Sequence, residues 1–139
     1  MPGIILIPLV GFVLILVSCG KGRTEKLLVD KQWRVTNVTP PANGNFDIED
    51  ENEAQQLKNS VYQNAWFEFT HYGIFMASFN GKLDSGDYKL NYNGKIISLY
   101  PLHGNRIYEQ IQIQRLNSKE LNFNTLIAHF YMTLHCKAH

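Results

Sequence analysis

From Asn64 to the C-terminus, apolar residues alternate with polar ones at a period of two. Successive side chains of a strand point to opposite faces, so this pattern predicts an antiparallel sheet with one buried and one solvated face. An earlier run, Gln32–Val38, is rich in β-branched residues and is followed by Pro40–Pro41, which predicts a first strand. The apolar side chains expected on the buried face are Trp33, Phe67, Phe69, Phe75, Phe79, Tyr88, Leu90, Tyr92, Ile111, Ile113, Phe130 and Met132.

Short turn signals separate the runs. Asn80–Gly81 and Asn93–Gly94 are the strongest, because a tight type I′ turn needs positive φ at both central residues. With the first strand included, we expect eight antiparallel strands and therefore an all-β fold, either an up-and-down barrel or a sandwich. The barrel is favoured, because a closed sheet leaves no exposed edge strand.

One segment has helical periodicity instead. Ala54, Leu57 and Val61 recur at spacings of three and four, which predicts a helix over residues 51–62 between the first and second strands. Acidic residues crowd its amino-terminal end, where carboxylates favour the helix dipole, and Asp50 or Asn52 is the expected cap.

The chain begins with an apolar leader. Ile4–Val17 is shorter than the roughly 20 apolar residues that a membrane-spanning helix needs, and it has the length of a signal-peptide core. No Lys or Arg precedes it. The following motif, Leu16-Val17-Ser18-Cys19, resembles the lipobox of bacterial lipoproteins. The alternatives are an ordinary secreted protein and a short anchor that is never removed.

The lipobox resemblance implies three parts: a lipoprotein signal peptide (1–18), a lipidated tether (19–26) and a barrel domain (27–139). Cys19 would carry several acyl groups, and two or more chains anchor a protein stably to a bilayer. We therefore expect a lipid-anchored protein of the bacterial cell envelope, with the membrane as a partner. Gly20 gives no signal for inner-membrane retention, which favours the outer membrane.

Composition narrows the function further. Removing 18 of the 139 residues leaves 121, enough for one domain. The formal charge is +1 and the barrel domain has no basic block, which argues against nucleic-acid binding. Once Cys19 is lipidated, Cys136 is the only remaining thiol, so we expect no disulfide and a small buried side chain at Cys136.

Two motifs of the barrel domain suggest a family. Leu28-x-x-x-x-Trp33-x-Val35 and Ser85-Gly86-Asp87-Tyr88-Lys89-Leu90 resemble the first strand and a central hairpin of bacterial lipocalin-like lipoproteins. The resemblance implies an eight-stranded barrel in which Trp33 plugs one end. The chain departs from the family at Lys31, where a glycine is expected, and offers Arg115 or Lys137 as the cation that accompanies the tryptophan.

An eight-stranded barrel is wide enough either to be filled by side chains or to hold one small ligand, and both remain open. The candidate ligand-binding residues are Trp33, Phe67, Phe69, Phe75, Tyr88, Tyr92, Glu109, Phe130 and Met132. Glu109 is in phase with Ile111, and an unpaired interior carboxylate is costly. We expect it either to orient a ligand or to meet Arg115 or solvent at the barrel mouth.

Catalytic and metal-binding motifs are lacking. There is no Gly-x-Ser-x-Gly elbow, phosphate-binding glycine loop or His-Glu-x-x-His helix, so we expect no enzyme and no cofactor. His129 and His135 share a face of the last strand but would lie roughly 20 Å apart, too far for one metal ion. His135 and Cys136 point to opposite faces and cannot form a nucleophile–base pair.

Two functional hypotheses follow. The first is a lipid-anchored barrel that binds a small hydrophobic ligand at the envelope. The second is a non-enzymatic interaction module, an inhibitor or accessory subunit, with a filled barrel. It would contact an envelope protein through the rim loops Pro40–Phe46 and Leu102–Arg106.

Overall fold

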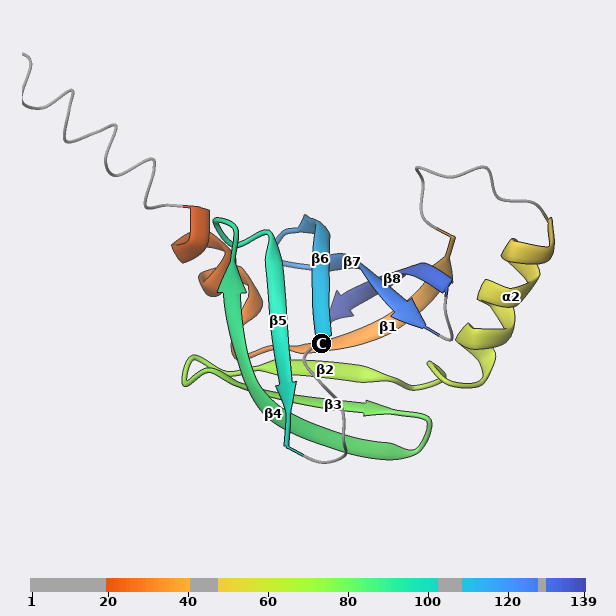
Figure 1. Cartoon of the computed structure of the whole chain (residues 1–139), viewed down its shortest axis with the longest axis horizontal. Coiled ribbons are helices and arrows are strands. Elements are labelled where there is room, and N and C mark those ends of the chain that lie inside the picture. Colours follow the sequence, from red (N-terminus) through yellow and green to blue (C-terminus); the bar gives the residue numbers. More distant parts are fainter. Residues whose placement is uncertain (1–19, 41–47, 103–108, 128–129) are drawn as a thin grey trace, which may run out of the picture.

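The computed structural model describes residues 20–40, 48–102, 109–127 and 130–139. Eight antiparallel strands form a closed barrel in chain order, as predicted (Figure 1). They are β1 (Gln32–Thr39), β2 (Trp66–Phe69), β3 (Ile74–Phe79), β4 (Lys82–Asn91), β5 (Ile96–Pro101), β6 (Glu109–Leu116), β7 (Glu120–Ile127) and β8 (Phe130–Ala138). Because β1 pairs with β8, the sheet closes on itself rather than forming a sandwich.

Helix α2 (Ile48–Asn59) connects β1 to β2 and begins three residues before the predicted start. The predicted caps, Asp50 and Asn52, therefore lie inside the helix. Its apolar stripe is confirmed, because Ala54 is buried and Leu57 packs against the same core.

A second helix covers residues 20–28 and therefore includes most of the segment that the sequence predicted as a tether, 19–26. This helix contacts the turn between β4 and β5, where a Cβ added to Gly94 would lie 2.5 Å from Thr24 Oγ1. Leu28, at its end, is fully buried. Tertiary contact, rather than local periodicity, holds the segment in place. Within the described ranges, no helix is both long and apolar enough to span a bilayer.

The two tight hairpin turns predicted from the sequence both form. Asn80 and Gly81 both have positive φ, at 53° and 71°, which confirms the type I′ assignment. The β4–β5 turn is centred one residue earlier than predicted. Its central residues are Tyr92 and Asn93, with φ of 51° and 59°, and Gly94 N donates to Asn91 O at 3.1 Å.

Strand β5 lacks the alternating pattern of its neighbours. Ile97, Ser98 and Leu99 are all buried in succession, so both faces of this strand are covered. The Ser98 hydroxyl accepts a hydrogen bond from Asn91 Nδ2 at 2.6 Å. That hydrogen bond satisfies a polar group which would otherwise be costly to bury.

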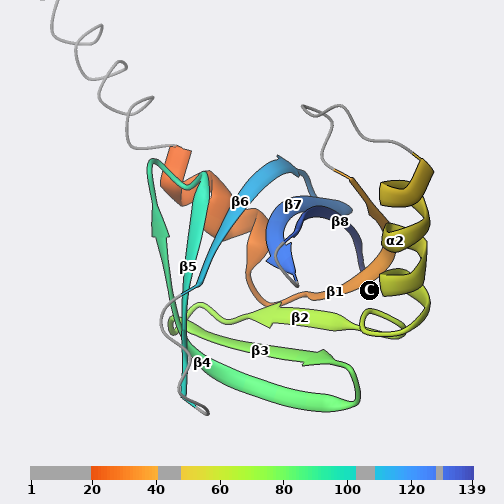
Figure 2. The same ribbon diagram turned by 45° about the vertical axis from the view of Figure 1, so that its right-hand side comes forward.

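The two ends of the barrel differ (Figure 2). The closed end carries helix 20–28 and the turns β2–β3, β4–β5 and β6–β7, whereas α2 and the β3–β4 turn lie at the other end, the mouth. Trp33 is fully buried at the closed end, and its indole Nε1 donates to Leu28 O at 2.9 Å. The tryptophan plug that the lipocalin resemblance implied is therefore present.

The cation beside this plug is neither Arg115 nor Lys137. Lys31 Nζ lies 5.6 Å from the centre of the Trp33 ring and donates to Ser118 O at 3.2 Å. Arg115 Nε instead lies 3.7 Å from Glu120 Oε2. Lys31, noted in the sequence only as a departure from the family pattern, supplies the cation–π contact.

Gly86 is predicted to be essential for the approach of β4 to β5. A Cβ at this position would lie 2.1 Å from Tyr100 O, so Gly86→Ala must displace backbone and is expected to cost about 1–3 kcal/mol of unfolding free energy. Urea unfolding measures the loss. Gly22→Ala is the control, because nothing lies within 4 Å of its added Cβ. Equal stability of Gly86→Ala and the parent chain would contradict this close approach of the two strands.

Candidate functional site

The mouth half of the barrel contains a cavity of about 340 Å³. Its aromatic lining consists of Tyr62, Phe67, Phe75, Phe79 and Phe123. Its aliphatic lining consists of Val61, Ala77, Leu99, Pro101, Ile111 and Leu134. Four polar residues, Asn80, Asp84, Glu109 and Thr125, complete it. A cavity of this size and composition is typical of a small-molecule site.

Three of the sequence-predicted ligand residues line this cavity: Phe67, Phe75 and Glu109. Phe67 meets Phe123 edge-to-face at 5.4 Å between ring centroids, so these two lining residues pack against each other. Glu109 is exposed at the start of β6, opposite Leu99. This position fits the expectation of a carboxylate in contact with solvent at the mouth.

Other predicted ligand residues are buried without lining the cavity. Trp33, Phe69 and Tyr88 pack in the closed half, where Phe69 and Tyr88 meet edge-to-face at 5.2 Å. Met132 is also buried away from the cavity lining. The interior is therefore filled by side chains at the closed end and hollow at the mouth. Of the two alternatives that the sequence left open, a filled interior describes the closed half and an open cavity describes the mouth half.

The prediction that Tyr92 lies inside the barrel is wrong. Its side chain is 72% exposed, because the chain leaves β4 at Asn91 and turns with positive φ at Tyr92. The alternation through Tyr88 and Leu90 therefore stops one step earlier than the sequence suggested. Phe130 begins β8, but its side chain lies outside the described part of the chain, as do Cys19 and its motif.

Sequence reasoning missed several lining residues. Tyr62 comes from the turn after α2, and Asn80 comes from a hairpin turn, where no periodicity signals a direction. The alternation correctly predicts inward side chains at Phe123 and Leu134, but it does not show how far along the barrel axis each residue lies. Asp84 lies in a polar segment beside the hairpin, where no apolar alternation marks the inward face.

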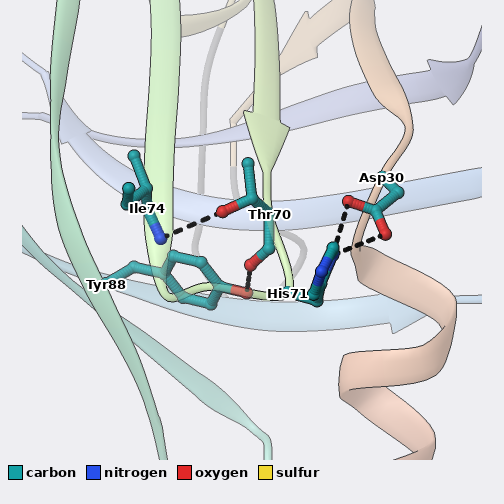
Figure 3. Close-up of polar contacts among 5 residues, drawn as sticks. All are labelled: Asp30, Thr70, His71, Ile74 and Tyr88. Carbon is teal, nitrogen blue, oxygen red and sulfur yellow. Dashed lines mark hydrogen bonds and ion pairs between the residues drawn. The ribbon is translucent and has the colours of Figure 1, made fainter.

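A polar cluster ties the closed end together (Figure 3). His71 Nδ1 lies 3.1 Å from Asp30 Oδ2, with both side chains about half exposed. The Tyr88 hydroxyl donates to Thr70 O at 2.5 Å, and burial, with smaller contributions from Glu25 and Asp30, raises the pKa of Tyr88 to about 12. Tyr88 therefore stays protonated at neutral pH, and the cluster fastens the β2–β3 turn to the segment before β1.

Two further groups of possible chemical interest, Cys136 and His135, do not line the cavity. Cys136 is a free, buried thiol, and burial raises its pKa far above the usual range. His135 Nε2 lies 2.8 Å from Thr39 Oγ1, and burial lowers the pKa of His135. In the part of the chain that the structure covers, no three His, Cys, Asp or Glu side chains are placed to share a metal ion.

The fold and cavity together define a closed eight-stranded antiparallel barrel, sealed at one end and hollow at the other. Among solved structures, the chain is similar to a DUF4847 family protein from Bacteroides vulgatus, with 12% sequence identity and a TM-score of 0.55. The match covers 81% of this chain and 95% of that one, and at this identity it shows the fold alone. No protein-family model and no curated protein matches the chain.

The burial of Cys136 predicts its reactivity. In a Cys19→Ala chain, Cys136 is the only thiol, and native protein at pH 8 should react with a thiol reagent at least ~100-fold more slowly than protein unfolded in guanidinium chloride. The reason is that reagent reaches the thiolate only after local opening. Similar rates in the two states would show that β8 does not bury this side chain.

Proposed function

We propose that this protein is a lipid-anchored, lipocalin-like protein of the bacterial cell envelope that binds a small hydrophobic ligand in the mouth-half cavity. The observation that carries the proposal is the cavity itself: about 340 Å³, lined by five aromatic, six aliphatic and four polar residues, and closed from below by the packed closed half. Displacing water from the aromatic and aliphatic part of the lining with apolar ligand atoms is favourable, while the four polar residues can contact a polar group of the ligand.

The cavity limits the size and orientation of the ligand. Taking ~30 Å³ per water-sized group, about 340 Å³ holds roughly eleven such groups, so a buried portion of about a dozen non-hydrogen atoms fits. Asp84 and Glu109 both contribute to the lining, and Glu109 is exposed. The apolar portion of the ligand would therefore lie among the aromatic rings, with its polar end near these carboxylates.

The anchor rests on the sequence motif Leu16-Val17-Ser18-Cys19. Gly20, the residue after Cys19, already belongs to the helix that packs on the closed end. An acylated Cys19 would therefore hold the barrel close to the bilayer surface. The cell envelope, with the outer membrane favoured, is the corresponding location.

One observation favours a second candidate function, a protein-interaction module. Leu83 and Leu102 are 66% and 69% exposed, and Leu102 N donates to Ser85 O at 2.9 Å, which places both leucines near the start of β4. Exposed apolar residues at a rim are typical of interaction surfaces. An inhibitor or accessory subunit would use this rim to contact an envelope protein.

Filling the cavity tests the ligand-binding proposal. Ala77 lines the cavity and is 2% exposed, so Ala77→Leu should weaken binding of the apolar dye N-phenyl-1-naphthylamine at least tenfold, or about 1.4 kcal/mol. Ser78→Leu is the matched control, because Ser78 neighbours Ala77 on β3 and does not line the cavity. Fluorescence titration gives both dissociation constants, and thermal melting checks the fold.

The outcomes separate the two functions. A parent chain that binds neither the dye nor an apolar panel would contradict the ligand proposal. Binding that survives Ala77→Leu but disappears in Leu83→Ser would place the apolar contact at the rim and favour the interaction module.

The anchor has its own test. Cys19→Ala is expected to leave an unprocessed or soluble precursor, because the acyl groups that hold the mature protein in the membrane cannot be attached. Detergent partitioning and intact mass report the change. Identical partitioning and mass before and after substitution would contradict lipidation.

A further inference from the structure

Charge is divided unequally along the barrel, although the whole chain has a formal charge of only +1. The closed half comprises residues 20–34, 68–74, 87–97, 113–122 and 135–139, and contains ten Lys or Arg against five Asp or Glu. The other described residues form the mouth half, which contains two Lys against six Asp or Glu. The described barrel is therefore electrically polar, basic at the closed end and acidic at the mouth.

Exposed aromatic side chains are found at the basic end. Tyr72, in the β2–β3 turn, is 79% exposed, and Tyr92, in the β4–β5 turn, is 72% exposed. Beside Tyr72, Lys21 and Lys89 line an open groove of about 400 Å³. Tyrosine rings and lysine ammonium groups are the side chains that favour the polar–apolar boundary of a bilayer.

The chain also enters the described structure at this end. Gly20 packs on the β4–β5 turn, where an added Cβ would lie 2.5 Å from Asn93 Oδ1. The leader and Cys19 precede Gly20 directly. An anchor at Cys19 would thus bring the basic end, rather than the acidic mouth, toward the membrane.

We propose that the closed end of the barrel docks on an anionic phospholipid surface, so that the mouth of the cavity points away from the membrane. The proposal rests on the lipid anchor of the proposed function and adds an orientation to it. Basic residues within about a Debye length of ~10 Å are attracted to anionic headgroups, while the acidic mouth is repelled. A ligand would then enter and leave on the aqueous side.

Accessibility of two labelled sites tests the orientation. Ser118 is exposed in the β6–β7 turn at the closed end, away from the turn that contacts Gly20, and Leu83 is exposed at the mouth. Ser118→Cys and Leu83→Cys are made in the full chain, purified from membranes and labelled with a fluorophore. Cys136 is buried and does not compete for the label. The proteins are reconstituted in vesicles of phosphatidylethanolamine with phosphatidylglycerol that contain a headgroup-attached quencher.

Quenching should be at least roughly fivefold stronger at position 118 than at position 83, because strands of eight to ten residues, tilted as in a closed barrel, separate the two ends by roughly 20–25 Å. Equal quenching at the two positions would overturn the docking. Intact mass of the same samples reports acylation of Cys19 separately. Absence of the acyl mass would show that the anchor on which the proposal rests has failed, whereas equal quenching in acylated samples would show that the orientation has failed, so the two failures are distinguishable.

Charge reversal shows whether the basic surface causes the orientation. Lys21, Arg23 and Lys26 are exposed on helix 20–28, and the triple change Lys21→Glu, Arg23→Glu and Lys26→Glu should remove the difference in quenching. Lys82→Glu, at an exposed mouth position, is the matched control and should preserve it. Persistence of the difference in the triple variant would overturn the electrostatic account.

Discussion

Burial of Trp33 at one end of the barrel is the interaction on which the rest of the structure depends. Its ring is fully buried, and its only polar atom donates to Leu28 O, so the large apolar surface is covered without an unsatisfied donor. Lys31 covers the ring and also bonds to the β6–β7 turn. A closed sheet alone would be open at both ends, whereas the buried Trp33 closes one end and leaves the other as the mouth.

Side-chain packing in the closed half explains why the cavity lies in the mouth half. Below the cavity, Phe69 and Tyr88 pack edge-to-face and occupy the interior. Above them, Ala77 lies between Phe67 on β2 and Asp84 on β4, and its small side chain leaves space in the cavity. The mouth half carries the acidic residues of α2 and the closed half most of the basic ones. The closed half thus combines the packed interior with most of the basic residues, and the mouth half combines the cavity with most of the acidic ones.

Period-two alternation and the turn signals between the runs predicted eight antiparallel strands, and the absence of exposed edges in a closed sheet favoured the barrel. Predictions from local sequence patterns failed where contacts with segments distant in the chain, or a turn, determined the structure. Ile97, Ser98 and Leu99 do not alternate because both faces of β5 are covered, and helix 20–28 forms against a turn distant in sequence. Tyr92 carries the inward phase but lies in the turn itself. The cavity could not be located from sequence, because its depth depends on the register of all the strands.

The central claim, a barrel filled at one end and hollow at the other, is tested most directly by methyl NMR under xenon pressure, since xenon binds against the apolar walls of protein cavities. Methyl resonances of Ala77, Ile111 and Leu134, which line the cavity, are expected to shift progressively with pressure. Those of Leu28, Ile97 and Leu121, which are fully buried outside the lining, should stay in place. Equal shifts in both groups, or none in the first, would contradict the account.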